Sequence, residues 1–424
     1  MAIQRWYKLD NAAKIFPPVS SKRRTNIFRL SFEMKEEVDP LILQKALEIV
    51  IERFPMFKVK LKKGIFWYYL ELNKAYAPLH KESSYICRMI ENYDDNRGYL
   101  FRLSYYYKRI ALETFHSLTD GFGALEFLKS IVYTYLELQD VTIKENISVL
   151  TKDVEVSVEE KQDSFNFHYN PKLKKPPKEE KALQFKSQQY SENWVGVITG
   201  TVDVNEIKKL ASNYNATITE YLAACLFLCA YKSRHLLEQK SKPFTIFIPV
   251  NLRRFFDSKT LRNFSLYVRT SLKLDKELEL ADIIEVVKKD MANGVDKEKL
   301  HAMFVNNVRK ERNLFVRIVP MFIKELILKL GYYLLGDSVN TLSFSNLGVV
   351  RLPEEMAKHI DKIIFANGAS FSSPLNLGVI SVNDKMTITF SSKLVDRSLQ
   401  KEYFRFLSDQ GINVTIEHNE LEVD

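Results

Sequence analysis

One short segment, His116-Ser117-Leu118-Thr119-Asp120-Gly121, has the residue types needed for acid–base chemistry. It follows a run typical of a strand, Tyr99 to Phe115, and precedes a run typical of a helix, Gly123 to Leu138. An imidazole titrates near neutral pH, so His116 at a strand end could accept a proton from a hydroxyl or amine nucleophile. The alternative is a structural histidine at a strand-to-helix corner, and this segment alone favours that alternative.

Two neighbours of the histidine have open roles. Asp120 could orient the imidazole, or it could be a structural carboxylate that pairs with an arginine and shapes the loop, and we favour the structural role. Gly121 is interpreted as a backbone requirement, either a positive φ or close approach by a ligand.

A second segment, Ser343 to Gly348, ends a strand in the later half of the chain. The hydroxyl of Ser345 and the amide of Asn346 are donors that could stabilise negative charge that develops on a reacting oxygen. A turn that merely ends a strand is the alternative, and the local sequence favours it.

A third block is rich in arginine: Pro249 to Phe256 followed by Thr260 to Phe264. Arg253, Arg254 and Arg262 could bind a coenzyme phosphate. They could equally hold a loop through carbonyl and carboxylate acceptors, and the loop role is slightly favoured.

Composition limits the classes of function. The chain has 424 residues, 46% of them hydrophobic, and a net charge of +9. Such an excess could serve nucleic acid, an anionic membrane face or an anionic coenzyme, but the basic residues are dispersed and no nucleic-acid module is evident. The remaining histidines lack metal-ligand spacing, so no metal site is predicted. Of the three cysteines, Cys225 and Cys229 share an apolar helical run and are predicted to be buried core thiols.

Nothing in the sequence indicates membrane insertion or export. The first residues lack an apolar signal core, and no segment has the uncharged length that spans a bilayer. We therefore expect a cytoplasmic protein, with loose contact with a membrane surface left open.

The elements that must position these residues read as alternating strands and helices. A helix is predicted from Asp39-Pro40 onward, paired strands at 57–61 and 66–72, and a long helical region at 278–335 broken near Gly294 and Pro320. We expect an N-terminal half at 1–165, a polar crossover linker at 166–190 and a C-terminal half at 191–424.

These segments resemble the superfamily of chloramphenicol acetyltransferase and peptide-synthetase condensation domains. The His-x-x-x-Asp-Gly spacing at His116 carries the resemblance. The arginine block and the opening Trp6 to Pro18 are similar to stand-alone alcohol acetyltransferase-type members. The resemblance implies an α+β fold, with two chloramphenicol acetyltransferase-like α/β sandwich halves in a V and a tunnel between them. It also implies that Arg53, after the first helix, pairs with Asp120.

The same resemblance implies an acyltransferase without a bound cofactor. His116 would be the general base, Ser345 or Asn346 would hold the oxyanion, and an acyl group would pass from a thioester, favoured as acyl-CoA, to a hydroxyl acceptor. Three alternatives stay open: an amine acceptor, a thioester on a carrier protein, and a non-catalytic binding module with the same fold.

Overall fold

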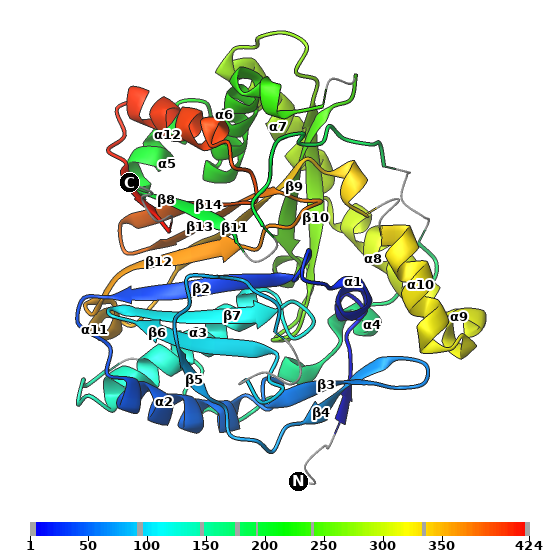
Figure 1. Cartoon of the computed structure of the whole chain (residues 1–424), viewed down its shortest axis with the longest axis vertical. Helices are drawn as coiled ribbons and strands as arrows, with labels where there is room; N and C mark the ends of the chain where they lie inside the picture. Colours follow the sequence, from blue (N-terminus) through cyan, green and yellow to red (C-terminus); the bar gives the residue numbers. More distant parts are fainter. Residues whose placement is uncertain are drawn as a thin grey trace.

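The computed structural model describes residues 6–90, 96–144, 148–173, 179–191, 194–238, 241–332 and 336–419. Within these ranges the strands form sheets of five, seven and three strands. The two larger sheets lie one above the other, with helices packed on their outer faces (Figure 1). This is the mixed α+β class expected from the sequence.

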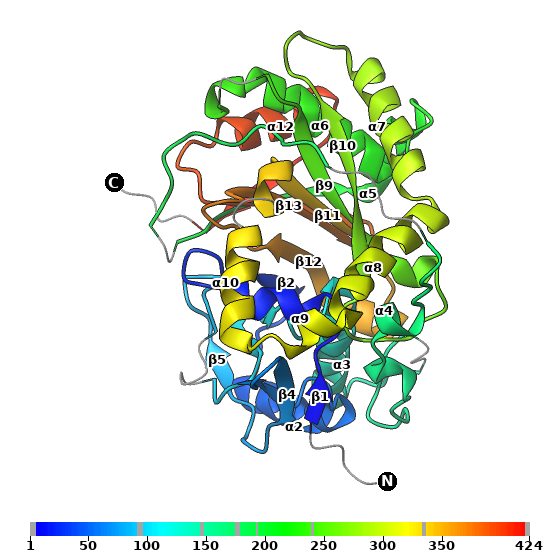
Figure 2. The ribbon, with the colours of Figure 1, turned by 90° about the vertical axis from the view of Figure 1, so that its right-hand side faces the viewer.

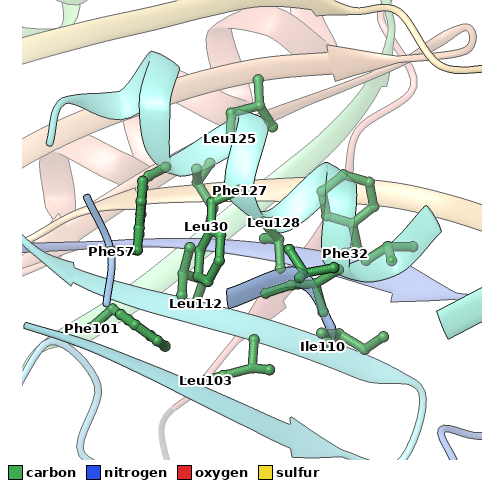
Figure 3. Close-up of a cluster of buried hydrophobic side chains, with 14 of the residues drawn as sticks. Leu30, Phe32, Phe57, Phe101, Leu103, Ile110, Leu112, Leu125, Phe127 and Leu128 are labelled. Atoms are coloured by element: carbon green, nitrogen blue, oxygen red, sulfur yellow. The ribbon is translucent and has the colours of Figure 1, made fainter. Parts of the chain in front are cut away.

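The five-stranded sheet belongs mainly to the N-terminal part of the chain. Its order is β12 (Ile360–Asn367), β2 (Ile27–Met34), β7 (Arg109–Phe115), β6 (Phe101–Tyr106) and β5 (Leu79–Lys81). Helices α2 (Pro40–Arg53) and α3 (Gly121–Glu137) cover one face, and their apolar side chains meet those of the strands in a core that includes Phe57, Phe101 and Phe127 (Figure 3). Helix α2 begins as predicted, because the Asp39 carboxylate accepts from the first free backbone N–H groups.

The single strand predicted from Tyr99 to Phe115 is wrong, because this run is a hairpin of β6 and β7. The chain reverses at Tyr107, which has a φ of 52°. A non-glycine residue rarely adopts this left-handed conformation. The turn also has no glycine, asparagine or proline that would have indicated it in the sequence.

The seven-stranded sheet forms the second half. Its order is β10 (Ser265–Leu272), β9 (Phe244–Asn251), β11 (Leu342–Val350), β13 (Leu375–Val382), β14 (Lys385–Ser392), β8 (Gly196–Asp203) and β15 (Thr415–His418). Its outer face is covered by α5 (Val204–Ser212), α6 (Ile218–Lys232), α7 (Leu280–Gly294) and α12 (Ser398–Asp409) (Figure 1). Helix α6 opens with a capping box of Thr217 and Glu220, and its two cysteines are buried, as predicted.

The two halves meet where β12 crosses β13 and β14. A Cβ added to Gly378 of β13 would lie 2.2 Å from the carbonyl oxygen of Phe365 in β12, so only glycine lets these backbones approach. The hydroxyl of Thr387 in β14 donates to the carbonyl of Ile363 in β12 at 2.7 Å. A strand from the late part of the chain thus belongs to the N-terminal sheet. The division at residues 166–190 remains a prediction from the sequence.

The remaining elements lie beside the junction of the halves. The third sheet has the order β1 (Trp6–Lys8), β4 (Tyr68–Leu72) and β3 (Val59–Lys63). After α7 come α8 (Lys297–Arg312), α9 (Leu314–Ile318) and α10 (Met321–Gly331), so the predicted breaks near Gly294 and Pro320 are confirmed and a further break lies at Asn313. Helices α1 (Phe16–Val19), α4 (Ser164–Phe167) and α11 (Glu354–Ala357) have only four residues each. None of the helices in the described ranges is long and apolar enough to cross a bilayer.

Candidate active site

His116 lies at the point where β7 ends and the turn into α3 begins. Its backbone N–H donates to the carbonyl oxygen of Asn26 at 2.9 Å, which extends the pairing of β7 with β2 by one residue. The next residue, Ser117, donates its hydroxyl hydrogen to the carbonyl oxygen of Ala13 at 2.8 Å. The imidazole is therefore carried on backbone that is tied on both sides.

Asn263 sets the tautomer of His116. The amide Nδ2 of Asn263 donates to the carbonyl oxygen of His116 at 3.0 Å and to Oδ2 of Asp10 at 3.2 Å. Because both partners are acceptors, the amide oxygen must be the atom that lies 3.0 Å from Nδ1 of His116. That oxygen only accepts, so Nδ1 carries the proton and Nε2 has the free lone pair. This is the tautomer in which Nε2 can act as a base.

Asp10 anchors Asn263 from behind. Its carboxylate is fully buried, accepts from the backbone N–H of Ala13 at 2.7 Å, and lies 3.6 Å from Nε of Arg262. Burial raises the pKa of Asp10, and the nearby Arg262 opposes that rise. Neither Asp10 nor Asn263 was predicted as a site residue. Both lie in segments that are similar to alcohol acetyltransferase-type members, and this similarity could have indicated them as site residues.

Two aromatic rings enclose the imidazole. Phe16 stacks on His116 with ring centroids 4.6 Å apart, and Phe28 meets it edge-on at 5.1 Å. Burial lowers the pKa of His116, while the charge of Asp120 and the hydrogen bond to Asn263 act in the opposite direction. Burial therefore favours the neutral form of the ring.

The Asp120 carboxylate is held by backbone N–H groups and by an arginine. It caps α3 by accepting from the backbone N–H of Gly123 at 3.2 Å and accepts from that of Phe264 at 2.8 Å. It also forms a two-pronged ion pair with Arg253, at 2.8 and 3.3 Å. These are the contacts of a carboxylate that shapes the loop and joins it to the second half of the chain.

The expected ion pair between Arg53 and Asp120 is wrong. Arg53 binds Glu160 instead, with nitrogen–oxygen distances of 2.8 and 3.0 Å, and both residues are buried. The arginine that reaches Asp120 is Arg253, which lies 133 residues further along the chain. The sequence offered several arginines, and only the folded path of the chain decides between them.

The positive φ considered for Gly121 is also wrong, because its φ lies outside the left-handed range. A Cβ there would lie 2.9 Å from a methyl group of Leu347. The tighter position is Gly123, where a Cβ would lie 2.1 Å from the carbonyl oxygen of Leu261. The glycine that the backbone requires most is therefore two residues beyond the predicted one.

A cavity of about 550 Å³ opens on His116 between the two halves. Its walls come from α3, from β9 and the start of β10, from α6 and α7, and from β11 and β12. His116, Asp120 and Gly121 lie on one side, and Ser345 and Asn346 of β11 lie among the residues from the second half. With Arg253 and Arg254, the structure thus brings together seven of the candidate site residues around one space, whereas Arg53 and Arg262 do not line it.

Ser345 and Asn346 differ in how their side chains are engaged. Asn346 accepts through Oδ1 from the backbone N–H of Gly348 at 2.8 Å and donates one of its two Nδ2 hydrogens to the hydroxyl of Thr219 at 3.0 Å. Ser345 Oγ accepts from Nδ2 of Asn367 at 3.3 Å, and this contact leaves the hydroxyl hydrogen to donate elsewhere.

A second cavity, of about 680 Å³, shares a lining residue with the first. Asn367 lines both cavities, and Asn26, whose carbonyl accepts from His116, lines the second. The amide of Asn367 also lies 3.4 Å from the hydroxyl of Ser343, which faces the second cavity. Asn367 therefore marks the place where the two spaces adjoin.

Two of the three predicted arginines, Arg253 and Arg262, stabilise loops through hydrogen bonds to backbone carbonyls and ion pairs with carboxylates. Besides Asp120, Arg253 donates to the carbonyls of Thr260 and Arg262. Arg262 donates to the carbonyl of Lys8 at 2.6 Å and pairs with Asp10. Arg254, by contrast, is exposed and lines the first cavity.

The sequence profile of the alcohol acetyltransferase family matches residues 106–408, which include the site around His116. The chain therefore belongs to the alcohol acetyltransferase family and is an acyltransferase. No curated protein matches the chain in a direct search.

Solved structures of low sequence identity share the fold. A trichothecene 15-O-acetyltransferase from Fusarium sporotrichioides has a TM-score of 0.60 at 12% identity, over 96% of this chain and 97% of that one. The starter condensation domain of rhizomide synthetase, in complex with C8-CoA, has a TM-score of 0.59 at 13% identity, over 96% and 94%. Polyketide synthase associated protein 5 from Mycobacterium tuberculosis has a TM-score of 0.57 at 12% identity, over 95% and 96%. The chain thus has the condensation-domain fold implied by the resemblance.

Proposed function

We propose that this protein transfers an acyl group from acyl-CoA to a hydroxyl acceptor, with His116 as general base. The observation that carries the proposal is the hydrogen bond between Nδ1 of His116 and Oδ1 of Asn263, at 3.0 Å. It leaves the basic Nε2 on a ring that lines a cavity between the two halves.

The reaction is a direct transfer. Nε2 of His116 takes the proton of the acceptor hydroxyl as that oxygen bonds to the thioester carbonyl carbon. The carbon–sulfur bond then breaks, and the departing thiolate takes the proton back from the imidazolium. The products are an ester and free coenzyme A, and His116 returns to its neutral form.

Two groups of the chain stabilise charges that develop on the way. The amide oxygen of Asn263 accepts from Nδ1–H throughout and so holds the imidazolium in place, with the Asp10 carboxylate behind it. Ser345 is our first candidate donor to the oxyanion, because its hydroxyl lines the cavity and its contact with Asn367 leaves the hydroxyl hydrogen to donate. The second Nδ2 hydrogen of Asn346 is the alternative donor, because only one is used in the bond to Thr219.

The two adjoining cavities support a reaction of two substrates that approach from different sides. Fixing both reactants on either side of one imidazole replaces an encounter in solution with a reaction of held partners. Arg254, exposed on the wall of the first cavity, is the arginine we assign to a phosphate of the coenzyme.

The choice of acceptor and the choice of acyl donor are supported by different observations. The family is named for alcohol acceptors, which favours a hydroxyl over an amine. One structural neighbour was solved with C8-CoA, which favours a coenzyme A thioester over a carrier-bound one.

A thiol-release assay tests the assignment of donor and acceptor. Purified protein is given acyl-CoAs of several chain lengths with alcohols, and in parallel with amines. A second series replaces acyl-CoA with the matching acyl thioesters of a phosphopantetheine-loaded carrier protein. We expect acceptor-dependent release from acyl-CoA with alcohols. Faster turnover with amines or with carrier-bound thioesters would overturn the corresponding part of the proposal, and no turnover with any pair would favour the non-catalytic alternative.

A further inference from the structure

Helix α10 has its polarity reversed relative to an ordinary surface helix. Five apolar side chains of this helix are between 38% and 67% exposed: Phe322, Ile323, Leu326, Ile327 and Leu330. Its charged Lys324 is buried instead, with only 5% exposure. A surface helix of a water-soluble domain places its apolar face inward.

Specific contacts hold the Lys324 side chain in its inward position, because its ammonium group has three partners. It donates to the carbonyl oxygen of Phe66 at 2.8 Å, contacts that of Arg317 at 3.4 Å and lies 3.7 Å from the ring centroid of Trp67. The rotation of α10 that exposes its apolar residues is therefore held by specific contacts.

Two neighbouring segments extend this apolar surface. Helix α9 has no buried residue, and Leu314, Phe315 and Ile318 are 60% to 77% exposed. The tip of the β3–β4 hairpin adds Ile65, which is 76% exposed and accepts from the backbone N–H of Met321 at the start of α10. Figures 1 and 2 show α9, α10 and this hairpin on one side of the molecule. We call this surface the α9–α10 face.

Positive charge borders the α9–α10 face. A groove of about 1290 Å³ runs beneath α9 along β1, β3 and β4. Among the described residues its lining has two carboxylates, Glu71 and Glu311, and eight cationic side chains: Lys8, Lys14, Lys60, Lys62, Lys63, Lys74, Arg97 and Arg317. Lys329 of α10 is exposed as well and lies near Glu325, which pairs with Lys63 of the groove.

We propose that the α9–α10 face docks on the surface of a lipid bilayer that contains anionic headgroups. Exposed apolar side chains would enter the boundary between headgroups and acyl chains, and the bordering lysines and arginines would meet the headgroup phosphates. A second copy of this chain fits less well, because a two-fold contact would bring the same basic borders together.

The dimensions fit an attachment that does not span the membrane. Helix α10 has 11 residues, which corresponds to about 16 Å at about 1.5 Å per residue. That is roughly half the thickness of the hydrocarbon core, so the helix would lie in the plane of the interface.

Docking at this face would place one substrate route beside the lipid. Ile327, Leu328 and Tyr332 line the second cavity, which adjoins the His116 cavity at Asn367. This consequence rests on the proposed function, whereas binding to the bilayer does not, because it is measured without any acyl transfer.

A site-specific fluorophore tests the docking directly. All three native cysteines are buried, so the full-length Phe315→Cys variant can be labelled at one exposed thiol with an environment-sensitive dye. The matched control is Leu41→Cys, at a residue that is 81% exposed on α2. With phosphatidylserine-containing vesicles we expect a blue shift of the dye at position 315 and none at position 41. Equal responses, or no response at 315, would overturn the proposal.

Vesicle flotation provides the second measurement. The triple variant Phe315→Ser, Phe322→Ser and Leu326→Ser should lose at least about tenfold in the fraction that floats with anionic vesicles. The control Leu41→Ser with Val158→Ser, also at highly exposed positions, should float like the wild type, and both should keep the wild-type thermal midpoint. Wild-type flotation on pure phosphatidylcholine equal to that on anionic vesicles would refute the charge argument. A wild-type dimer that the triple variant dissociates would assign the surface to a second copy instead.

Discussion

Nδ1 of His116 lies 3.0 Å from Oδ1 of Asn263, a residue 147 positions away in the sequence. The pair links the end of β7 in the N-terminal sheet to the segment just before β10 in the C-terminal sheet. One hydrogen bond therefore both joins the two halves at the site and selects Nε2 as the basic nitrogen.

The first prediction concerns this hydrogen bond. Asn263→Ala removes the acceptor for Nδ1–H, so the ring loses its preferred tautomer and orientation. We expect kcat to fall about 10²-fold, within the usual range of general-base catalysis, with a small change in KM. Steady-state kinetics of the variant test this, with Asn213→Ala, at an exposed residue after α5, as the control. A rise in KM alone, with kcat retained, would contradict the orienting role.

The pH dependence follows from the environment of His116. Burial lowers the pKa of this imidazole from its ordinary value of 6.5, so the neutral base is present at and above pH 7 and is lost only as the pH falls through the lowered pKa. We expect the acid limb of kcat/KM to have its midpoint below 6.5. A midpoint above that value would mean that a carboxylate, and not burial, dominates the site.

The corrected ion pairs make a prediction about stability. Removing one partner of a buried pair costs about 3–5 kcal/mol, so Asp120→Ala, Arg253→Met and Arg53→Met should each lower the free energy of unfolding. In double-mutant cycles, Asp120 and Arg253 should show strong coupling. Arg53 and Asp120 should be additive within about 0.5 kcal/mol, because they share no contact. Urea unfolding of the single and double variants measures both terms, and coupling between Arg53 and Asp120 would show that our pairing is wrong.

Ser345, the proposed oxyanion donor, has a matched control two residues earlier on the same strand. Ser345 and Ser343 both lie near the amide of Asn367, but Ser345 lines the His116 cavity and Ser343 lines the other. Ser345→Ala should lower kcat about 10²- to 10³-fold, the usual cost of one oxyanion donor, while Ser343→Ala should change it little. Equal effects of the two substitutions would refute the assignment.

Local patterns in the sequence predicted what depends on local physics. The Asp39 cap of α2, the capping box of α6 and the position of His116 between a strand and a helix all follow from neighbouring residues. The hairpin between β6 and β7 could not be predicted because its reversal at Tyr107 uses a conformation that this residue type rarely adopts.

Long-range partners could not be derived in the same way. Arg253 and Arg53 are both arginines near promising motifs, and only the chain path shows that the first pairs with Asp120 and the second with Glu160. The addition of β12 to the N-terminal sheet is likewise a pairing across more than three hundred residues, for example Phe365 with Leu30, for which an apolar strand pattern has no preference.

The central claim is that His116 takes the proton from the acceptor. The most direct measurement is thiol release from acyl-CoA with a saturating alcohol, comparing the wild type with His116→Ala and with His359→Ala, a control at a residue that lines neither cavity. We predict that His116→Ala loses about 10²- to 10⁴-fold in kcat while its unfolding curve stays cooperative, and that His359→Ala keeps wild-type turnover. Retention of wild-type kcat by a folded His116→Ala protein would contradict the account.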